Sequence, residues 1–174
     1  RIGMARSYTK LDDDLSYDAF ADEIRKGLNY VSDGRAHIFD FSVDDTKVSD
    51  NENEHRMNDG GNVKITAKVA AYLPSKQDRA AARIQKGGYA GRPYWHVEKA
   101  RIPDSRKVQV ELVVNGETVD RTEITADGDV RTVSFKHNIQ KSSWVALKIT
   151  YAAHTNPIYV VVDDKPVRGP RESI

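Results

Sequence analysis

The chain has 174 residues, of which 39% are hydrophobic and 30% are charged, a balance typical of one globular domain with a well-solvated surface. Its 27 basic residues offset its 26 acidic ones, and this net charge of +1 predicts no nucleic-acid partner. No cysteine is present, which excludes disulfides, zinc–thiolate sites and thiol catalysis but fixes no compartment. No apolar run approaches the roughly 20 residues of a membrane span.

The first predicted element is an amphipathic helix over residues 17–28. Ser16 is a suitable N-cap, and Gly27 is a suitable C-terminal stop. The apolar residues of this segment recur at helical spacing and share one face: Tyr17, Phe20, Ala21, Ile24 and Leu28. The simplest interpretation is a packed surface helix.

From residue 39 onward the pattern changes to β-structure. Apolar and polar residues alternate over residues 39–43, 63–71, 108–114 and 145–151, and residues 158–162 form a continuous apolar run. Asn115-Gly116 predicts a tight type I′ hairpin. The predicted fold is therefore mainly β: an antiparallel immunoglobulin-like β-sandwich of about seven strands, with an N-terminal helix–strand segment and a helical insertion.

Two segments interrupt this alternation. Residues 44–61 are polar and acidic, which predicts a mobile, solvated loop. Residues 74–106 form a long insertion in which Ser75 and Asp78 predict a capping box, and Gly87-Gly88 marks the end of a short helix. An insertion of this length in a compact domain is commonly functional or disordered.

Two groups of residues are candidates for a substrate-proximal surface. Asp33, Arg35 and His37 could line an anion-binding or metal-proximal rim, or they could mark an ordinary strand start with Gly34 at the turn. In the insertion, Tyr94, Trp95 and His96 could stack on a sugar or a base; alternatively, Trp95 anchors the insertion on the sandwich.

Other aromatic and histidine residues have simpler interpretations. His154 to Pro157 is expected to be a turn, and Trp144 is expected to face away from Val145 and Leu147. The five histidines show no H-x-H or H-E-x-x-H spacing, and no G-x-S-x-G nucleophile elbow is present, so local motifs assign no catalytic or metal-binding residue. An autonomous enzyme built on His37, His96 and His154 is a further alternative.

The order of several short motifs resembles the C-terminal region of the CehA/McbA-like metallohydrolases, a bacterial group with a PHP-type catalytic domain. In that family a helix ending in an (I/L)RxG step precedes a (Y/F)V(S/T)(D/N)G strand, and an immunoglobulin-like sandwich follows. The matching segments are Ile24-Arg25-Lys26-Gly27, Tyr30-Val31-Ser32-Asp33-Gly34-Arg35, Val110-Glu111-Leu112-Val113-Val114-Asn115-Gly116, Ser142-Ser143-Trp144-Val145-Ala146-Leu147 and His154-Thr155-Asn156-Pro157-Ile158-Tyr159-Val160.

The resemblance implies that residues 1–36 are the tail of an upstream catalytic domain and that residues 37–174 are an accessory β-sandwich with the insertion at 74–106. The family's H-x-H and D-x-H metal-ligand pairs are missing from this sequence, and the resemblance places them upstream of Arg1, in keeping with the lack of an initiator Met. Divalent metal ions are thus expected in the parent's catalytic domain, with no cofactor and no catalytic residue in this chain.

The expected function is a non-catalytic accessory domain of a metal-dependent phosphoester or related ester hydrolase. Its expected partner is the parent catalytic domain in cis, and loss of that partner predicts self-association through the helix at residues 17–28. The alternative function is a stand-alone carbohydrate-binding or adhesion module. Export of the parent protein is left open by the sequence.

Overall fold

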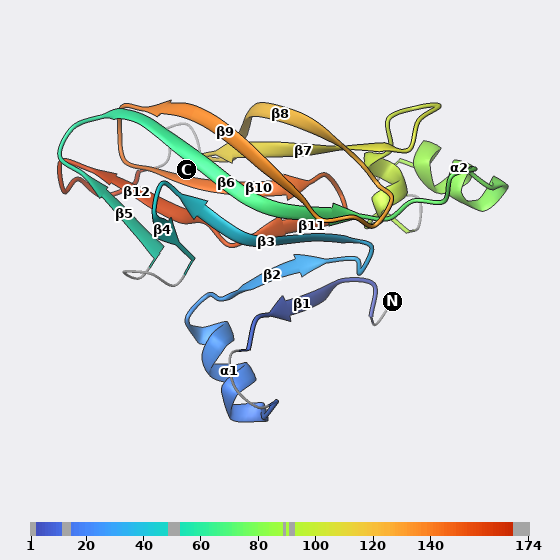
Figure 1. The fold of residues 1–174 in the computed structure, drawn as a ribbon, viewed down its shortest axis with the longest axis horizontal. Helices are drawn as coiled ribbons and strands as arrows, with labels where there is room; N and C mark the ends of the chain where they lie inside the picture. The colour runs from blue at the N-terminus through green and yellow to red at the C-terminus, as the bar shows by residue number, and fades with distance from the viewer. Residues whose placement is uncertain (1–2, 12–14, 49–52, 89, 91–92, 169–174) are drawn as a thin grey trace.

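Two β-sheets packed face to face make up most of the molecule (Figure 1). The computed structural model describes residues 3–11, 15–48, 53–88, 90 and 93–168, and the account below concerns these residues. The prediction of a mainly β sandwich with a helical insertion is confirmed.

The larger sheet has eight strands, with β10 (Ser143–Ile149) at its centre. One edge of β10 pairs with β7 (Lys107–Val114), which pairs in turn with β8 (Glu117–Thr125). Its other edge pairs with β12 (Ile158–Val162) and β11 (Ala153–Thr155). Beyond these lie β5 (Glu54–Met57) on β12, and β2 (Asn29–Ser32) followed by β1 (Arg6–Thr9) on β11.

The smaller sheet has the order β4 (Thr46–Lys47), β3 (Ala36–Val43), β6 (Gly61–Ala71) and β9 (Arg131–Ile139). Its neighbouring strands are antiparallel, and a bulge between Phe39 and Ser42 shifts the β3–β6 register where Asp40 has φ of 51°. In the larger sheet, the β12–β5 pair is parallel, which departs from the expected antiparallel arrangement.

The hydrophobic core lies between the two sheets and follows the predicted alternation. Both sheets contribute to one contiguous cluster of buried side chains, which includes Ile38, Val63, Ile65, Val69, Phe135, Val110, Leu112, Leu147, Ile149 and Val160. Residues between them along each strand point outward, so one face of each sheet is left for solvent or for ligands.

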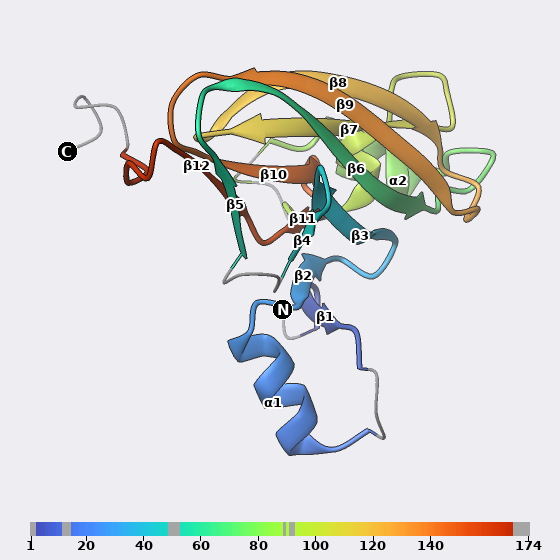
Figure 2. The same cartoon turned by 60° about the vertical axis from the view of Figure 1, so that its left-hand side comes forward.

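The N-terminal helix α1 (Tyr17–Arg25) stands away from both sheets (Figure 2). The Ser16 hydroxyl accepts a hydrogen bond from the Ala19 amide as its N-cap, and Gly27 with φ of 81° follows the helix, as predicted. No residue of α1 is buried, although Phe20 and Ala21 are half-buried. The β1–α1–β2 unit is held to the sandwich through β2, which hydrogen-bonds to β11.

The insertion contains helix α2 (Arg79–Lys86) and a single 3₁₀ turn, η2 (Val97–Ala100). The N-cap of α2 is Asp78, whose carboxylate accepts from the Ala81 amide, so the expected capping box begun by Ser75 does not form. The helix ends at Gly87, as expected.

Three further expectations need correction, because strands of two to four residues carry little alternation. The described residues form twelve strands rather than about seven. The polar segment expected to be a mobile loop over residues 44–61 contributes β4 and β5, one to each sheet. His154 belongs to strand β11 rather than to a turn. The connection between β11 and β12 consists of Asn156 and Pro157.

Candidate functional site

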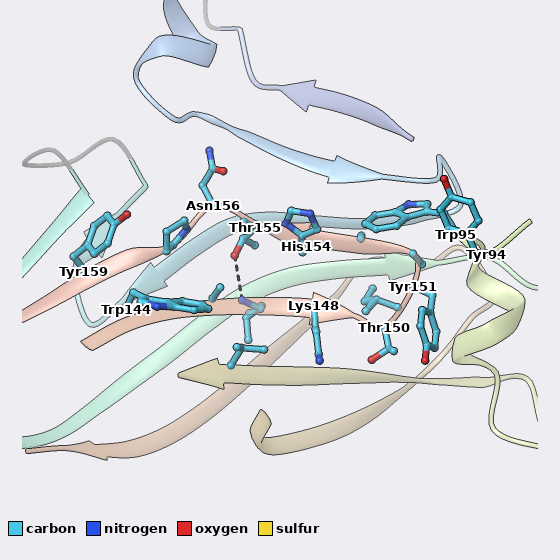
Figure 3. A pocket seen from close by; sticks show the side chains of 17 residues that line it. Tyr94, Trp95, Trp144, Lys148, Thr150, Tyr151, His154, Thr155, Asn156 and Tyr159 are labelled. Carbon is cyan, nitrogen blue, oxygen red and sulfur yellow. Dashed lines mark hydrogen bonds between the residues drawn. The ribbon is translucent and has the colours of Figure 1, made fainter. Parts of the chain in front are cut away.

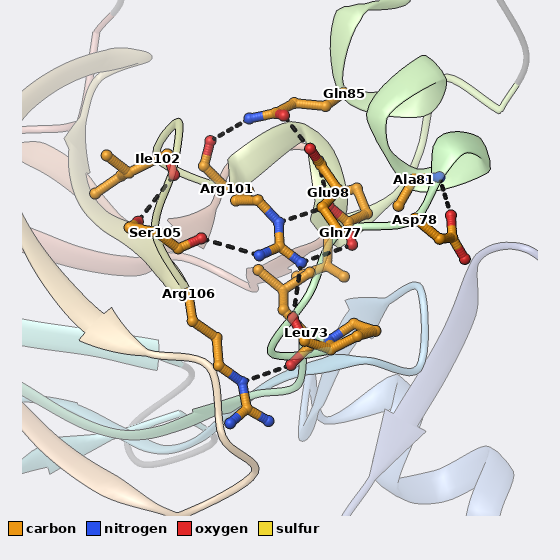
Figure 4. Close-up of polar contacts among 12 residues, drawn as sticks. Leu73, Gln77, Asp78, Ala81, Gln85, Glu98, Arg101, Ile102, Ser105 and Arg106 are labelled. Carbon is orange, nitrogen blue, oxygen red and sulfur yellow. Dashed lines mark hydrogen bonds and ion pairs between the residues drawn. The ribbon is translucent and has the colours of Figure 1, made fainter.

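A buried ion pair at η2 holds separate segments of the insertion together (Figure 4). Arg101 donates to both carboxylate oxygens of Glu98, at 2.7 and 2.9 Å, and Gln77 donates to the same carboxylate at 3.1 Å. Glu98 is 1% exposed and Arg101 is 6% exposed. Burial alone raises the pKa of Glu98, but the hydrogen bonds from Arg101 and Gln77 outweigh it, so its pKa lies below the usual value.

Asp33 links this insertion to the turn between β2 and β3. One carboxylate oxygen accepts from the Arg35 amide at 2.8 Å, and the other accepts from the Val97 amide at 2.7 Å. The second bond spans 64 positions of sequence. The Asp33-Gly34-Arg35 turn and the Tyr94-Trp95-His96 loop therefore lie side by side.

A polar hollow with a volume of about 560 Å³ lies where these two segments meet. Five of the six residues proposed from the sequence line it, namely Asp33, Arg35, Tyr94, Trp95 and His96. Met4, Arg83, Ile84 and Pro93 are also part of its lining. We refer to this cavity as the polar hollow.

His37, the sixth proposed residue, lies outside the lining of this hollow. It packs edge-on against Tyr8, with ring centroids 5.0 Å apart, and its Nδ1 lies 2.8 Å from the Tyr30 hydroxyl. Burial lowers the pKa of His37, and burial together with Tyr8 raises the pKa of Tyr30 to about 12. The surroundings of His37 are thus those of a half-buried packing residue, which was the simpler of the two alternatives.

His96 lines the hollow, and among the described residues only one of its two ring nitrogens, Nδ1, has a hydrogen-bond partner. Its Nδ1 accepts a hydrogen bond from the Glu98 amide at 3.0 Å, so in the neutral ring the proton is on Nε2. Burial, aided by the charge of Arg35 and opposed by that of Asp33, lowers the pKa of His96. A neutral His96 is therefore a hydrogen-bond donor through Nε2.

A second, more apolar cavity runs along the outer face of the larger sheet (Figure 3). Its volume is about 670 Å³, and we refer to it as the aromatic groove. Trp144 and Tyr159 lie toward one end, and Tyr94, Trp95 and Tyr151 lie toward the other. Both tryptophans of the chain therefore line one groove.

The floor of the groove comes from β10 residues that point away from the core. Trp144, Ala146 and Lys148 line it and alternate with the buried Val145, Leu147 and Ile149. The predicted orientation of Trp144 is confirmed by its position in this lining. Across the β10–β12 pair, Trp144 lies directly opposite Tyr159, which places two aromatic side chains together.

Polar groups lie in the middle of the groove. Lys148 forms an ion pair at 3.1 Å with Glu111, whose carboxylate also accepts from Thr118 at 2.7 Å and from Thr150. Burial acts to raise the pKa of Glu111, and the hydrogen bonds from the two threonines and Lys148 outweigh it and lower the pKa. Because Lys148 is paired, it adds no uncompensated charge to the groove.

Trp95 stands between the two cavities and lines both of them. Its indole ring packs edge-on against His154, with centroids 5.9 Å apart. Within the described chain, its indole nitrogen is buried without a hydrogen-bond partner. A buried donor without a partner destabilises the folded state by about 1–3 kcal/mol. Other contacts of the loop must offset this loss for Trp95 to keep its position.

Four further residues reach these cavities from separate elements and stand in none of the candidate groups of the sequence: Arg83, Lys148, Tyr151 and Tyr159. The sequence does indicate that Tyr159 points outward, because it lies between the apolar residues Ile158 and Val160, which are buried. Nothing in the sequence indicates that Arg83 of α2 and Arg35 line the same cavity.

The described residues contain no group of three or more His, Asp or Glu side chains arranged to hold a metal ion. In the same residues, no helix is both long and apolar enough to cross a bilayer. Comparison with protein-family models and with curated proteins finds no match to this chain.

Proposed function

We propose that the chain is a non-catalytic accessory domain of a metal-dependent phosphoester or related ester hydrolase, which packs on the catalytic domain and shapes access of the substrate. The main supporting observation is the polar hollow, where the Asp33-Gly34-Arg35 turn meets the Tyr94–His96 loop. The turn belongs to the N-terminal segment whose helix and strand motifs resemble those of the CehA/McbA-like metallohydrolases. The hollow therefore lies where that segment meets the insertion of the sandwich.

Helix α1 supports the same proposal. The β1–α1–β2 unit is hydrogen-bonded into the larger sheet, yet its helix buries no side chain against the sandwich. Leu15 and Tyr17 are 85% and 83% exposed. Leu15 lies just before the helix and Tyr17 is its first residue, and exposed apolar residues grouped in this way are typical of an interaction surface, which here is the contact with the catalytic domain.

In this proposal the catalytic domain supplies the divalent metal ions that activate water, and this chain supplies a wall beside them. The side chains that form the wall are Arg35, Tyr94, Trp95 and His96, which bind and orient the substrate and perform no bond-breaking step.

The proposal is tested on the full reading frame that encodes the chain. We expect H-x-H and D-x-H pairs upstream of Arg1, and we expect the intact protein to retain divalent metal after purification. A reading frame without these pairs, or an intact protein that holds no metal and hydrolyses no ester, contradicts the proposal.

The aromatic groove favours a second candidate function, the binding of a carbohydrate. Several rings line it around a neutral polar centre, and such apolar walls with a few polar groups suit an uncharged amphipathic ligand. The outer face of β10 from Trp144 to Thr150 spans roughly 20 Å, long enough for an oligosaccharide.

Glycan titration by calorimetry separates this candidate from the first. Binding by the wild type that is lost in Trp95→Ala and in Trp144→Ala, but kept in Tyr17→Ala on the distant helix, supports a carbohydrate module. If the wild type binds no member of a broad glycan panel, the second candidate is wrong.

A further inference from the structure

Two arginines face the polar hollow from different elements. Arg35 belongs to the turn before β3 and Arg83 belongs to α2, and both side chains are exposed. Within the described residues, neither guanidinium group makes a hydrogen bond or an ion pair, whereas Arg101 and Arg131 are held by carboxylates. As far as the described part of the chain is concerned, their donors are therefore available to a ligand.

The acidic residue in the lining is already engaged. Both carboxylate oxygens of Asp33 accept backbone amides, from Arg35 and from Val97. These amide dipoles offset part of its charge, and its role is to hold the two walls together. The remaining formal charge of the lining is positive, with two arginines against one carboxylate.

A third donor comes from His96. Because its Nδ1 accepts from the Glu98 amide, its Nε2–H is left for a ligand in the neutral ring. The Glu98 carboxylate also acts on this ring and favours its protonated form, but it is buried and already accepts hydrogen bonds from Arg101 and Gln77.

We propose that the polar hollow binds a tetrahedral oxyanion, such as the phosphoryl group of a phosphoester, through Arg35 and Arg83, with His96 as a third donor. Planar guanidinium groups with several fixed N–H donors match the oxygen geometry of phosphate. Tyr94 and Trp95 form the apolar side of the same cavity, where the organic part of an ester would lie.

This inference rests on the proposed function in taking the anion to be part of the hydrolase substrate. The binding itself is a property of this chain and is measured on it directly. If the chain binds no anion but the intact protein hydrolyses an ester, only this inference is overturned. If the chain binds the anion but the intact protein hydrolyses no ester, only the proposed function is overturned.

The experiment measures binding of inorganic phosphate, phenyl phosphate, sulfate and acetate to the 174-residue chain by calorimetry at constant ionic strength set with chloride. We expect the phosphates to bind, with phenyl phosphate binding more tightly because its ring contacts Tyr94 and Trp95. We expect Arg35→Gln and Arg83→Gln each to weaken phosphate binding by about tenfold or more, as for loss of a charged hydrogen bond. Arg121→Gln, an exposed arginine on β8, is the matched control and should bind as the wild type does.

His96→Asn keeps an acceptor for the Glu98 amide and removes the Nε2 donor, so it should weaken binding without unfolding the loop. Equal binding of sulfate and phosphate would support the oxyanion site and assign no preference for phosphoryl groups. Wild-type affinity in both arginine variants, preference for acetate, or no heat above the chloride baseline would overturn the proposal.

Discussion

At the scale of single residues, the candidate site depends on a few buried polar contacts that position exposed side chains. Asp33 holds the turn against the loop, and the Glu98–Arg101 pair holds separate segments of the insertion together. Asp33 and Arg35 are candidates from the sequence because they stand in a short polar motif, and His96 is a candidate because it follows two aromatic residues. The sequence could not identify Arg83 or the use of Glu98, since these depend on how the insertion folds back on the sheets.

Breaking the Glu98–Arg101 pair should strongly destabilise the chain. In Arg101→Met the Glu98 carboxylate is left buried and unpaired, which costs about 3–5 kcal/mol of the free energy of unfolding. Urea denaturation followed by circular dichroism measures this loss. Lys107→Met breaks the exposed Lys107–Glu123 pair as a control and should change stability by less than about 1 kcal/mol. Similar losses of unfolding free energy in the two variants would contradict a stabilising role for the buried Glu98–Arg101 pair.

Stability should fall as the pH drops from about 7 toward 5. Burial lowers the pKa values of His37 and His96 in the folded state, so the unfolded chain, with histidine pKa near 6.5, takes up protons first. The loss of stability begins as the pH falls through the histidine pKa of the unfolded chain. It is complete once the pH lies below the lowered pKa values of His37 and His96 in the folded chain. The free energy of unfolding at several pH values should show a smaller fall in the double variant His37→Gln, His96→Asn. If the free energy of unfolding falls equally steeply with pH in the wild type and the double variant, the proposed effect of burial on His37 and His96 is wrong.

At the scale of elements, the long strands follow from alternation, and the short ones do not. The strands β6, β7, β9 and β10 bury one face against the opposite sheet, which imposes period two on their sequences. The edge strands β4 and β5 lie in a polar segment, and their pairing depends on the neighbouring strand more than on their own residues.

The hairpin between β7 and β8 requires a glycine. Asn115 and Gly116 both have positive φ, at 51° and 93°, as a type I′ turn demands. Gly116→Ala should lower the free energy of unfolding by about 1–2 kcal/mol, because a residue with a Cβ disfavours positive φ. The added Cβ would not clash, since the nearest heavy atom, of Trp144, would lie 3.9 Å from it. Gly88→Ala, with open space and no positive φ, should leave stability nearly unchanged in the same thermal-unfolding measurement. Equal losses in the two variants would contradict the turn assignment.

At the scale of the whole molecule, a two-sheet sandwich carries a projecting N-terminal unit on one side and the insertion at one end (Figures 1 and 2). The sequence indicated a junction near residue 36, and that boundary stays a prediction. The strand β2 nevertheless extends the larger sheet through β11, so the first segment is structurally continuous with the sandwich.

The exposed face near α1 predicts concentration-dependent self-association of the isolated chain. Analytical ultracentrifugation should show larger species for the wild type as concentration rises. Leu15→Lys with Tyr17→Lys should reduce them, because it places charge in an exposed apolar patch, whereas Val130→Lys on the turn before β9 should not. A wild type that is monomeric at every concentration would contradict this use of the helix.

In the proposed function, the Tyr94–His96 loop faces the substrate of a metal-dependent ester hydrolase. The most direct test compares kcat/KM for an aryl phosphoester between the intact protein and its Trp95→Ala variant, with the metal content of both measured. We expect metal-dependent hydrolysis by the intact protein, with a lower kcat/KM and the same metal content in the variant. Absence of ester hydrolysis in the intact protein, or equal kcat/KM in the two proteins, would contradict the proposed function.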